Sequence, residues 1–142
     1  MEKNNQFKVA ILWMLMAVGI VMHSVFALDG IFFGAKLQLP DTDGSEPAFF
    51  TVAHIVFEIL PLLMAMLAVF ITAKGFVWFS CLWASLLCLF NTYHLIATCG
   101  EEPFSIAQIV LLAFVLTVNI MLTITLWKSL KGKVHADECC TK

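Results

Sequence analysis

The chain alternates between long apolar segments and short polar connections. The apolar segments span residues 9–28, 49–73, 76–98 and 103–127. Each contains at least about the 20 residues that an α-helix needs to cross some 30 Å of hydrocarbon. Helices are expected because backbone polar groups inside a bilayer must be satisfied within their own segment. The pattern predicts an all-α integral membrane protein, an up-down-up-down four-helix bundle formed by residues 9–128.

The lysines set the expected orientation of this bundle. Lysine and arginine accumulate on the cytoplasmic side of membrane proteins. On one side of the predicted bundle lie Lys3, Lys8, Lys74, Lys128, Lys131 and Lys133, and the opposite side has Lys36 alone among acidic residues. We therefore expect residues 1–8 and a disordered tail, residues 129–142, in the cytoplasm. The loops 29–48 and 99–102 are expected to face outward. Trp13, Trp78 and Trp127 fall near the inner helix ends, as in an interfacial aromatic belt.

Composition agrees with a membrane location. The chain has 142 residues, of which 61% are hydrophobic and 13% charged. Soluble domains average about 45–50% apolar and about 25% charged residues. The apolar excess is expected to contact the lipid bilayer of a cell inner (plasma) membrane. A net charge of -2 without a basic stripe argues against a nucleic-acid partner.

The N-terminus permits a second interpretation. Two lysines, an apolar run and Val25-Phe26-Ala27 resemble a signal peptide that would be cleaved after Ala27. The run is longer than a usual signal-peptide core, which favours a first membrane helix. Cleavage of residues 1–27 nevertheless remains an alternative.

Polar residues fall at one depth of the predicted bundle. Ionisable groups within a membrane are costly, usually face the bundle interior and mark functional sites. Near the outer ends of the four segments lie His23 on the first, His54 and Glu58 on the second, Asn91 and His94 on the third, and Ser105 and Gln108 on the fourth. His54 and Glu58 are four residues apart and so share one helix face. We expect these side chains to converge on one site.

Such a site suits a metal ion or a haem. Imidazole is the commonest biological metal ligand, and a carboxylate completes common ligand sets. We expect His23, His54, Glu58 and His94 to hold a transition metal ion (Zn, Fe or Cu), with Asn91, Ser105 and Gln108 orienting the ligands. Alternatively, two of the histidines would ligate a b-type haem. Either site would serve transport, sensing or electron transfer.

Two other classes of function remain open. In the first, Glu58 and His54 titrate in a proton-coupled carrier of small molecules. In the second, the chain is a non-catalytic subunit of a larger membrane complex or forms a homo-oligomer. An enzyme is not favoured, because the sequence contains no nucleophile–base pair and no phosphate-binding motif.

The C-terminal tail contains a second candidate metal site. His135, Cys139 and Cys140 lie close together in the sequence. Thiolate and imidazole groups bind soft metal ions. An ordinary solvated tail is the alternative.

Overall fold

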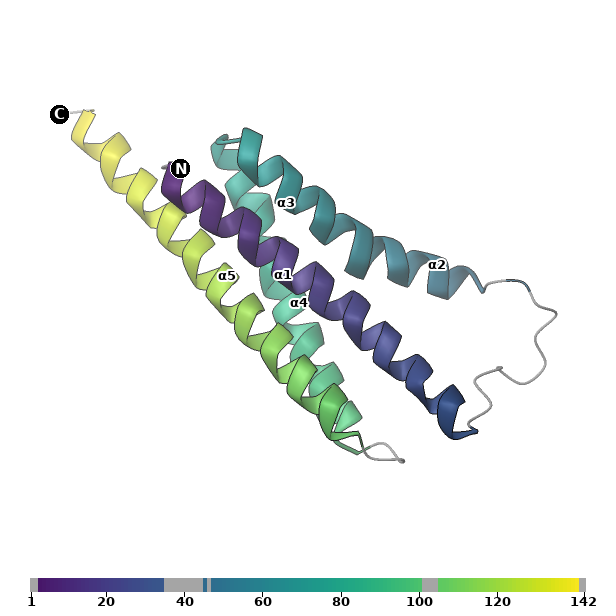
Figure 1. Cartoon of the computed structure of the whole chain (residues 1–142). Coiled ribbons are helices and arrows are strands. Elements are labelled where there is room, and N and C mark those ends of the chain that lie inside the picture. Colours follow the sequence, from purple (N-terminus) through teal and green to yellow (C-terminus); the bar gives the residue numbers. More distant parts are fainter. Residues whose placement is uncertain (1–2, 35–44, 46, 101–104, 141–142) are drawn as a thin grey trace.

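The computed structural model describes residues 3–34, 45, 47–100 and 105–140, and within these ranges the side chains of residues 27, 30, 33 and 132–140 are not described. All regular elements of the described residues are helical. They are α1 (Lys3–Leu28), η1 (Asp29–Phe33), α2 (Ala48–His54), η2 (Ile55–Ile59), α3 (Leu60–Phe70), α4 (Lys74–Thr98) and α5 (Ile106–Cys140). The elements α2, η2 and α3 follow one another without a break and form one long rod (Figure 1).

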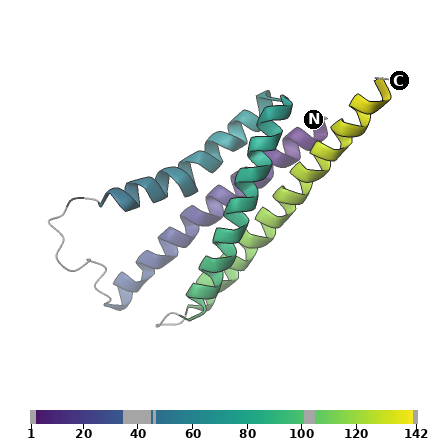
Figure 2. The same cartoon turned by 180° about the vertical axis from the view of Figure 1, so that it is seen from behind.

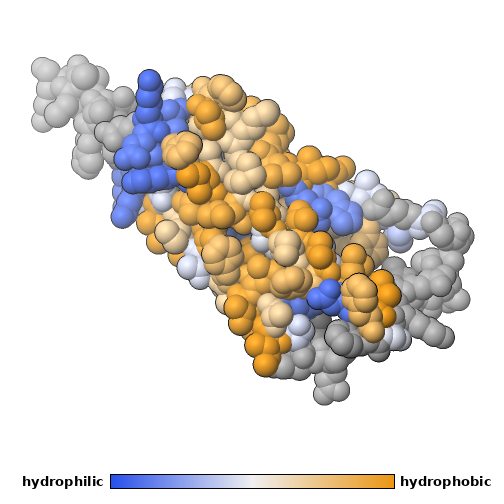
Figure 3. All heavy atoms as spheres, viewed as in Figure 1, coloured by the Kyte–Doolittle hydropathy of each residue, from blue (hydrophilic) through white to orange (hydrophobic). Residues whose placement is uncertain are grey.

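Four helical stretches of the described chain are long and apolar enough to cross a membrane. They are Lys3–Phe26, Ala48–Phe70, Lys74–Thr98 and Ile106–Lys131. Many large apolar side chains on these helices face outward. In Figure 3, hydrophobic residues cover most of the visible face, and hydrophilic residues gather mainly at the end where α1 begins. The four stretches indicate a multi-pass membrane protein, as the hydrophobic pattern predicts.

Helix α1 lies at the centre of the bundle. It packs along η2 and α3 and along α5, and α4 packs along α5 (Figures 1 and 2). α1 approaches α5 tightly at Gly19. A methyl group added there would collide with the Cγ2 atom of Val115. The missing side chain of Gly19 therefore lets the two helices lie against each other.

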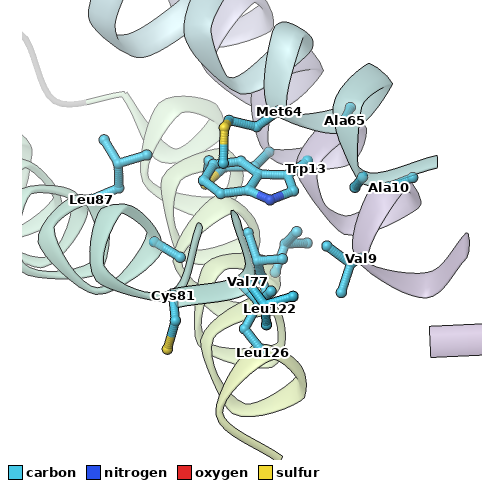
Figure 4. Packing of buried hydrophobic residues seen from close by; sticks show 14 of the residues in the cluster. Val9, Ala10, Trp13, Met64, Ala65, Val77, Cys81, Leu87, Leu122 and Leu126 are labelled. Atoms are coloured by element: carbon cyan, nitrogen blue, oxygen red, sulfur yellow. The ribbon is translucent and has the colours of Figure 1, made fainter. Parts of the chain in front are cut away.

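Trp13 is at the centre of the core and not in an aromatic belt. It is 0% exposed, and it lies among apolar residues of the neighbouring helices, including Met64, Val77 and Leu122 (Figure 4). Its indole Nε1–H donates a hydrogen bond to the Ser80 Oγ atom at 3.1 Å. This hydrogen bond to a neighbouring helix satisfies the N–H of the ring, so the ring can be buried at little cost in free energy. Trp78 and Trp127 are exposed, as a belt requires.

The rod formed by α2, η2 and α3 contains one wide turn. In η2 the backbone N–H of Leu60 donates to the carbonyl of Ile55, five residues earlier, which is the π-helical pattern. Pro61 follows directly. We attribute the wide turn to this proline, because it lacks an N–H and its ring crowds the carbonyl four residues before it. Glu58 belongs to this turn.

Helix α5 begins after Ser105, whose Oγ atom accepts a hydrogen bond from the Gln108 backbone N–H at 3.4 Å. The helix continues to Cys140, past the expected segment end at residue 127. At the other terminus, α1 begins at Lys3, within the segment 1–8 expected to precede the first span. The central part of the expected loop 29–48 and residues 101–102 lie outside the described residues. The cytoplasmic placement of both terminal segments stays a prediction.

Candidate functional site

Two histidines from different helices meet directly. The Nε2 atom of His23 on α1 lies 3.0 Å from the Nε2 atom of His94 on α4. The rings are perpendicular, with centroids 4.9 Å apart and an interplanar angle of 87°. With one proton between the two nitrogens, one ring donates and the other accepts. The pair therefore bridges α1 and α4 through a single shared proton.

Aromatic rings hold His94 in place. The ring of Phe90, one turn before it on α4, stacks on His94 with centroids 5.9 Å apart. Phe90 in turn stacks on Phe57 of η2, with ring centroids 4.2 Å apart. These contacts fix the imidazole against the bundle and connect it to the wide turn of η2.

A carboxylate with two partners lies on the neighbouring rod. The Oε1 atom of Glu58 lies 3.0 Å from His54 Nδ1 and 3.3 Å from the Ser24 hydroxyl, which divides its hydrogen between Glu58 and the Ile20 carbonyl, also 3.3 Å away. The side chain of Glu58 is 23% exposed and that of His54 is 50% exposed. A carboxylate in a bilayer needs such donors, since leaving it without them is costly. The contact with Ser24 also joins η2 to α1.

The two pairs are adjacent because His23 and Ser24 are consecutive residues of α1. The structure thus brings His23 to His94 and His54 to Glu58, at one level of the bundle. It does not assemble all four into one ligand set. Among the residues that the structure describes, no group of three or more His, Cys, Asp or Glu side chains could hold a metal ion.

The geometry also bears on the haem alternative. Two axial imidazoles stand on opposite faces of a haem, each at a metal–nitrogen distance of roughly 2 Å, as in other metal–imidazole bonds. Their nitrogens are then about 4 Å apart, farther than the 3.0 Å between His23 and His94. As arranged here, this pair does not accommodate a haem.

The three expected orienting residues have different surroundings. Ser105 caps the N-terminus of α5 through its hydroxyl oxygen. Gln108 contributes its backbone N–H to this cap and is half-buried. Asn91 is buried on α4, one turn below His94. None of the three has a described side-chain contact to the four expected ligands.

Sequence reasoning missed Ser24 and the two phenylalanines. Ser24 is a small hydroxyl residue beside a histidine, and only the packing of η2 against α1 makes it a partner of Glu58. Phe57 and Phe90 are ordinary apolar residues of a membrane span in sequence. The tail candidates His135, Cys139 and Cys140 are in α5, but their side chains are outside the described part of the chain.

Comparisons of the chain with protein families, curated proteins and solved structures gave no match.

Proposed function

We propose that this chain is a membrane protein that binds and releases protons at the polar layer formed by the two pairs, in a proton-coupled carrier or a sensor of external pH. The observation that carries the proposal is the position of Glu58. One carboxylate oxygen lies within hydrogen-bond distance of both His54 and Ser24. A membrane carboxylate beside an imidazole is a typical arrangement for proton handling.

The histidine pair provides a mechanism by which proton binding would alter the bundle. With one shared proton, His23 and His94 attract each other. One further proton at this contact puts a hydrogen on both Nε2 atoms and makes one ring cationic, so neither nitrogen can accept and the contact becomes repulsive. The carboxylate of Glu58 lies beside Ser24, the residue next to His23. Protonation would therefore separate α1 from α4 at this level.

The proposal is tested with purified protein in liposomes that contain a pH-sensitive dye. Under an imposed proton gradient, we expect Glu58→Gln to slow proton entry by about tenfold or more, a barrier increase of about 1.4 kcal/mol. The substitution keeps the shape of the side chain but removes its charge. Asp29→Asn is the matched control, because Asp29 is an exposed carboxylate in η1. Equal rates for Glu58→Gln and the unsubstituted protein would contradict the proposal.

We further propose an up-down-up-down arrangement in the inner (plasma) membrane, with both termini in the cytoplasm. The loops 29–48 and 99–102 then face outside, and the polar layer lies in the outer half of the bilayer. The distribution of lysines supports this orientation. It would place the two pairs within reach of external protons.

Metal binding stays a prediction for His23, His54, Glu58 and His94. Elemental analysis of the purified protein beside a His54→Ala variant tests it. A near-stoichiometric metal that is lost in the variant would replace the proton proposal. Association with a second copy or with a larger membrane complex is likewise still a prediction.

A further inference from the structure

Buried polar residues occur on α4 and on α5, two helices that pack along each other. The buried positions of α4 recur every three or four residues and form one stripe facing its neighbours. Within this stripe lie Ser80, Asn91 and Thr98, and the buried polar residues of α5, the helix that packs along α4, are Asn119 and Ser129. Among the described residues, the other buried polar side chain is Gln6 of α1. We call the three residues Asn91, Thr98 and Asn119 the seam polar residues.

The seam polar residues differ from the others in their hydrogen bonding. Ser80 accepts a bond from Trp13, and Ser129 donates one to the Thr125 carbonyl. By contrast, neither amide atom of Asn119 has a hydrogen-bond partner within the described protein, although the residue is 0% exposed. The Nδ2 atom of Asn91 and the Oγ1 atom of Thr98 are in the same situation.

Such groups are costly to bury. A buried donor or acceptor without a partner destabilises a protein, because it has given up its hydrogen bonds to water. In native proteins these atoms are therefore bound by another group, often by an internal water molecule with two to four polar partners. Several groups of this kind on two packed helices are better explained by a common ligand than by separate causes.

The spacing of these residues permits a chain of water molecules. At about 1.5 Å per residue, Asn91 lies about 10 Å below Thr98 along α4. Asn119 lies about 20 Å along α5 from its outer end, and so about 9 Å deeper than Asn91. Ser80 is about 7–8 Å deeper again. His94 falls between Thr98 and Asn91, so the series passes the level of the polar layer.

Small side chains lie near the depth of Asn119 on two other helices. On α4, Ala84 lies at nearly the same depth, and on α1 Ala17 lies within about one turn, counted from the contact between Gly19 and Val115. Both alanines are 0% exposed. Side chains this short fill less of the space between the helices than leucines would.

We propose that water enters the α4–α5 seam and binds to Thr98, Asn91 and Asn119, forming a hydrated path from the polar layer to the middle of the bundle. The path would carry protons between His94 and the inner half of the protein, and this role rests on the proposed function. Hydration of the seam itself does not depend on it.

Cysteine accessibility tests the path directly. In a background where the native cysteines are replaced by serine or alanine, Asn119→Cys and Leu122→Cys are each treated with silver ion in liposomes. Leu122 is the matched control, because it is also 0% exposed and lies one turn away in the same stripe. Silver reacts with thiolate, which forms only where water can stabilise its charge.

We expect Asn119→Cys to react at least about tenfold faster than Leu122→Cys, because burial without water suppresses a thiolate by more than that factor. Equal, slow reaction at both positions would overturn the proposal and indicate a direct bond between Asn119 and a neighbouring helix. If Asn119→Cys does not fold, Asn91→Cys and Leu87→Cys form the second pair, judged by the same ratio.

A second variant separates this proposal from the proposed function. Asn119→Leu removes the polar group while keeping a similar volume, so we expect unchanged or higher thermal stability and slower proton entry into liposomes. Fast silver labelling with no proton entry in the unsubstituted protein would retain the hydrated seam and reject the proton function. Strong destabilisation by Asn119→Leu, with no effect on proton entry, would overturn the path.

Discussion

Trp13 shows that one hydrogen-bond partner can decide whether a large side chain is buried in the core or lies at the membrane surface. By sequence position alone, a tryptophan near the inner end of a membrane helix fits the aromatic belt, with its N–H directed to the lipid headgroups. The structure instead buries the ring and directs the N–H to Ser80. The difference depends on a residue 67 positions away. Sequence patterns along one helix contain no information about such a partner.

A double-mutant cycle measures this hydrogen bond. Trp13→Phe and Ser80→Ala each remove one partner, and the combined variant removes both. We expect a coupling free energy of about 0.5–1.5 kcal/mol, as for an ordinary internal hydrogen bond, from unfolding of the detergent-solubilised protein. The cycle cancels the packing lost with the smaller ring. Strict additivity of the two single losses would show that the bond does not contribute to stability.

The same distinction applies to the polar layer. The depth of His23, His54, Glu58 and His94 follows from counting residues along apolar segments. How they pair does not, because it depends on the rotation of each helix about its axis. The expectation that these side chains converge on one site is met only in part. Ser24 connects the two pairs, but no group of three or more potential ligands forms among the described residues. Because no such ligand group forms among the described residues, the metal hypothesis from the sequence gains no support from the geometry.

At the scale of helices, hydrophobic length locates the spans and local chemistry decides their ends and irregularities. The predicted segment 76–98 corresponds to α4, Lys74–Thr98, and 49–73 corresponds to the rod from Ala48 to Phe70. The π turn in that rod was not expected, although its cause, Pro61, is visible in the sequence. Proline allows several distortions, and the surrounding packing selects one.

The contact between α1 and α5 depends on Gly19. We expect Gly19→Ala to destabilise the protein by about 1–3 kcal/mol, the usual cost of overpacking. The new methyl group would meet Val115, a β-branched residue whose side chain cannot easily rotate away. Thermal unfolding followed by circular dichroism in detergent measures the loss.

Two variants make this measurement specific. Gly75→Ala is the matched control, because nothing lies near the added methyl group there and no loss is expected. Placing Gly19→Ala in a Val115→Ala background should remove most of the penalty. If Gly19→Ala and Gly75→Ala behave alike, the helices are not in close contact at Gly19.

For the molecule as a whole, apolar surface and charge serve different purposes. The exposed apolar side chains of the four spans indicate a membrane protein, but they do not specify which side of the membrane each end of the bundle faces. The orientation across the membrane is predicted from the lysines, which lie mostly at one end of the predicted bundle. Lys131, for example, places its ammonium group 5.5 Å from the centre of the Trp127 ring. This contact suits an interface where an aromatic ring meets anionic headgroups.

The native cysteines provide a test of the proposed direction. Cys99 is exposed at the end of α4 that we place outside, whereas Cys81 is buried. In right-side-out membrane vesicles, a membrane-impermeant maleimide should label the protein, and Cys99→Ser should abolish that labelling. After permeabilisation, additional labelling should appear in the unsubstituted protein. That additional labelling should be absent from a Cys139→Ser, Cys140→Ser variant. The reverse pattern, with Cys99 labelled only after permeabilisation, would place both termini outside. The polar layer would then lie in the inner half of the bilayer and respond to cytoplasmic protons.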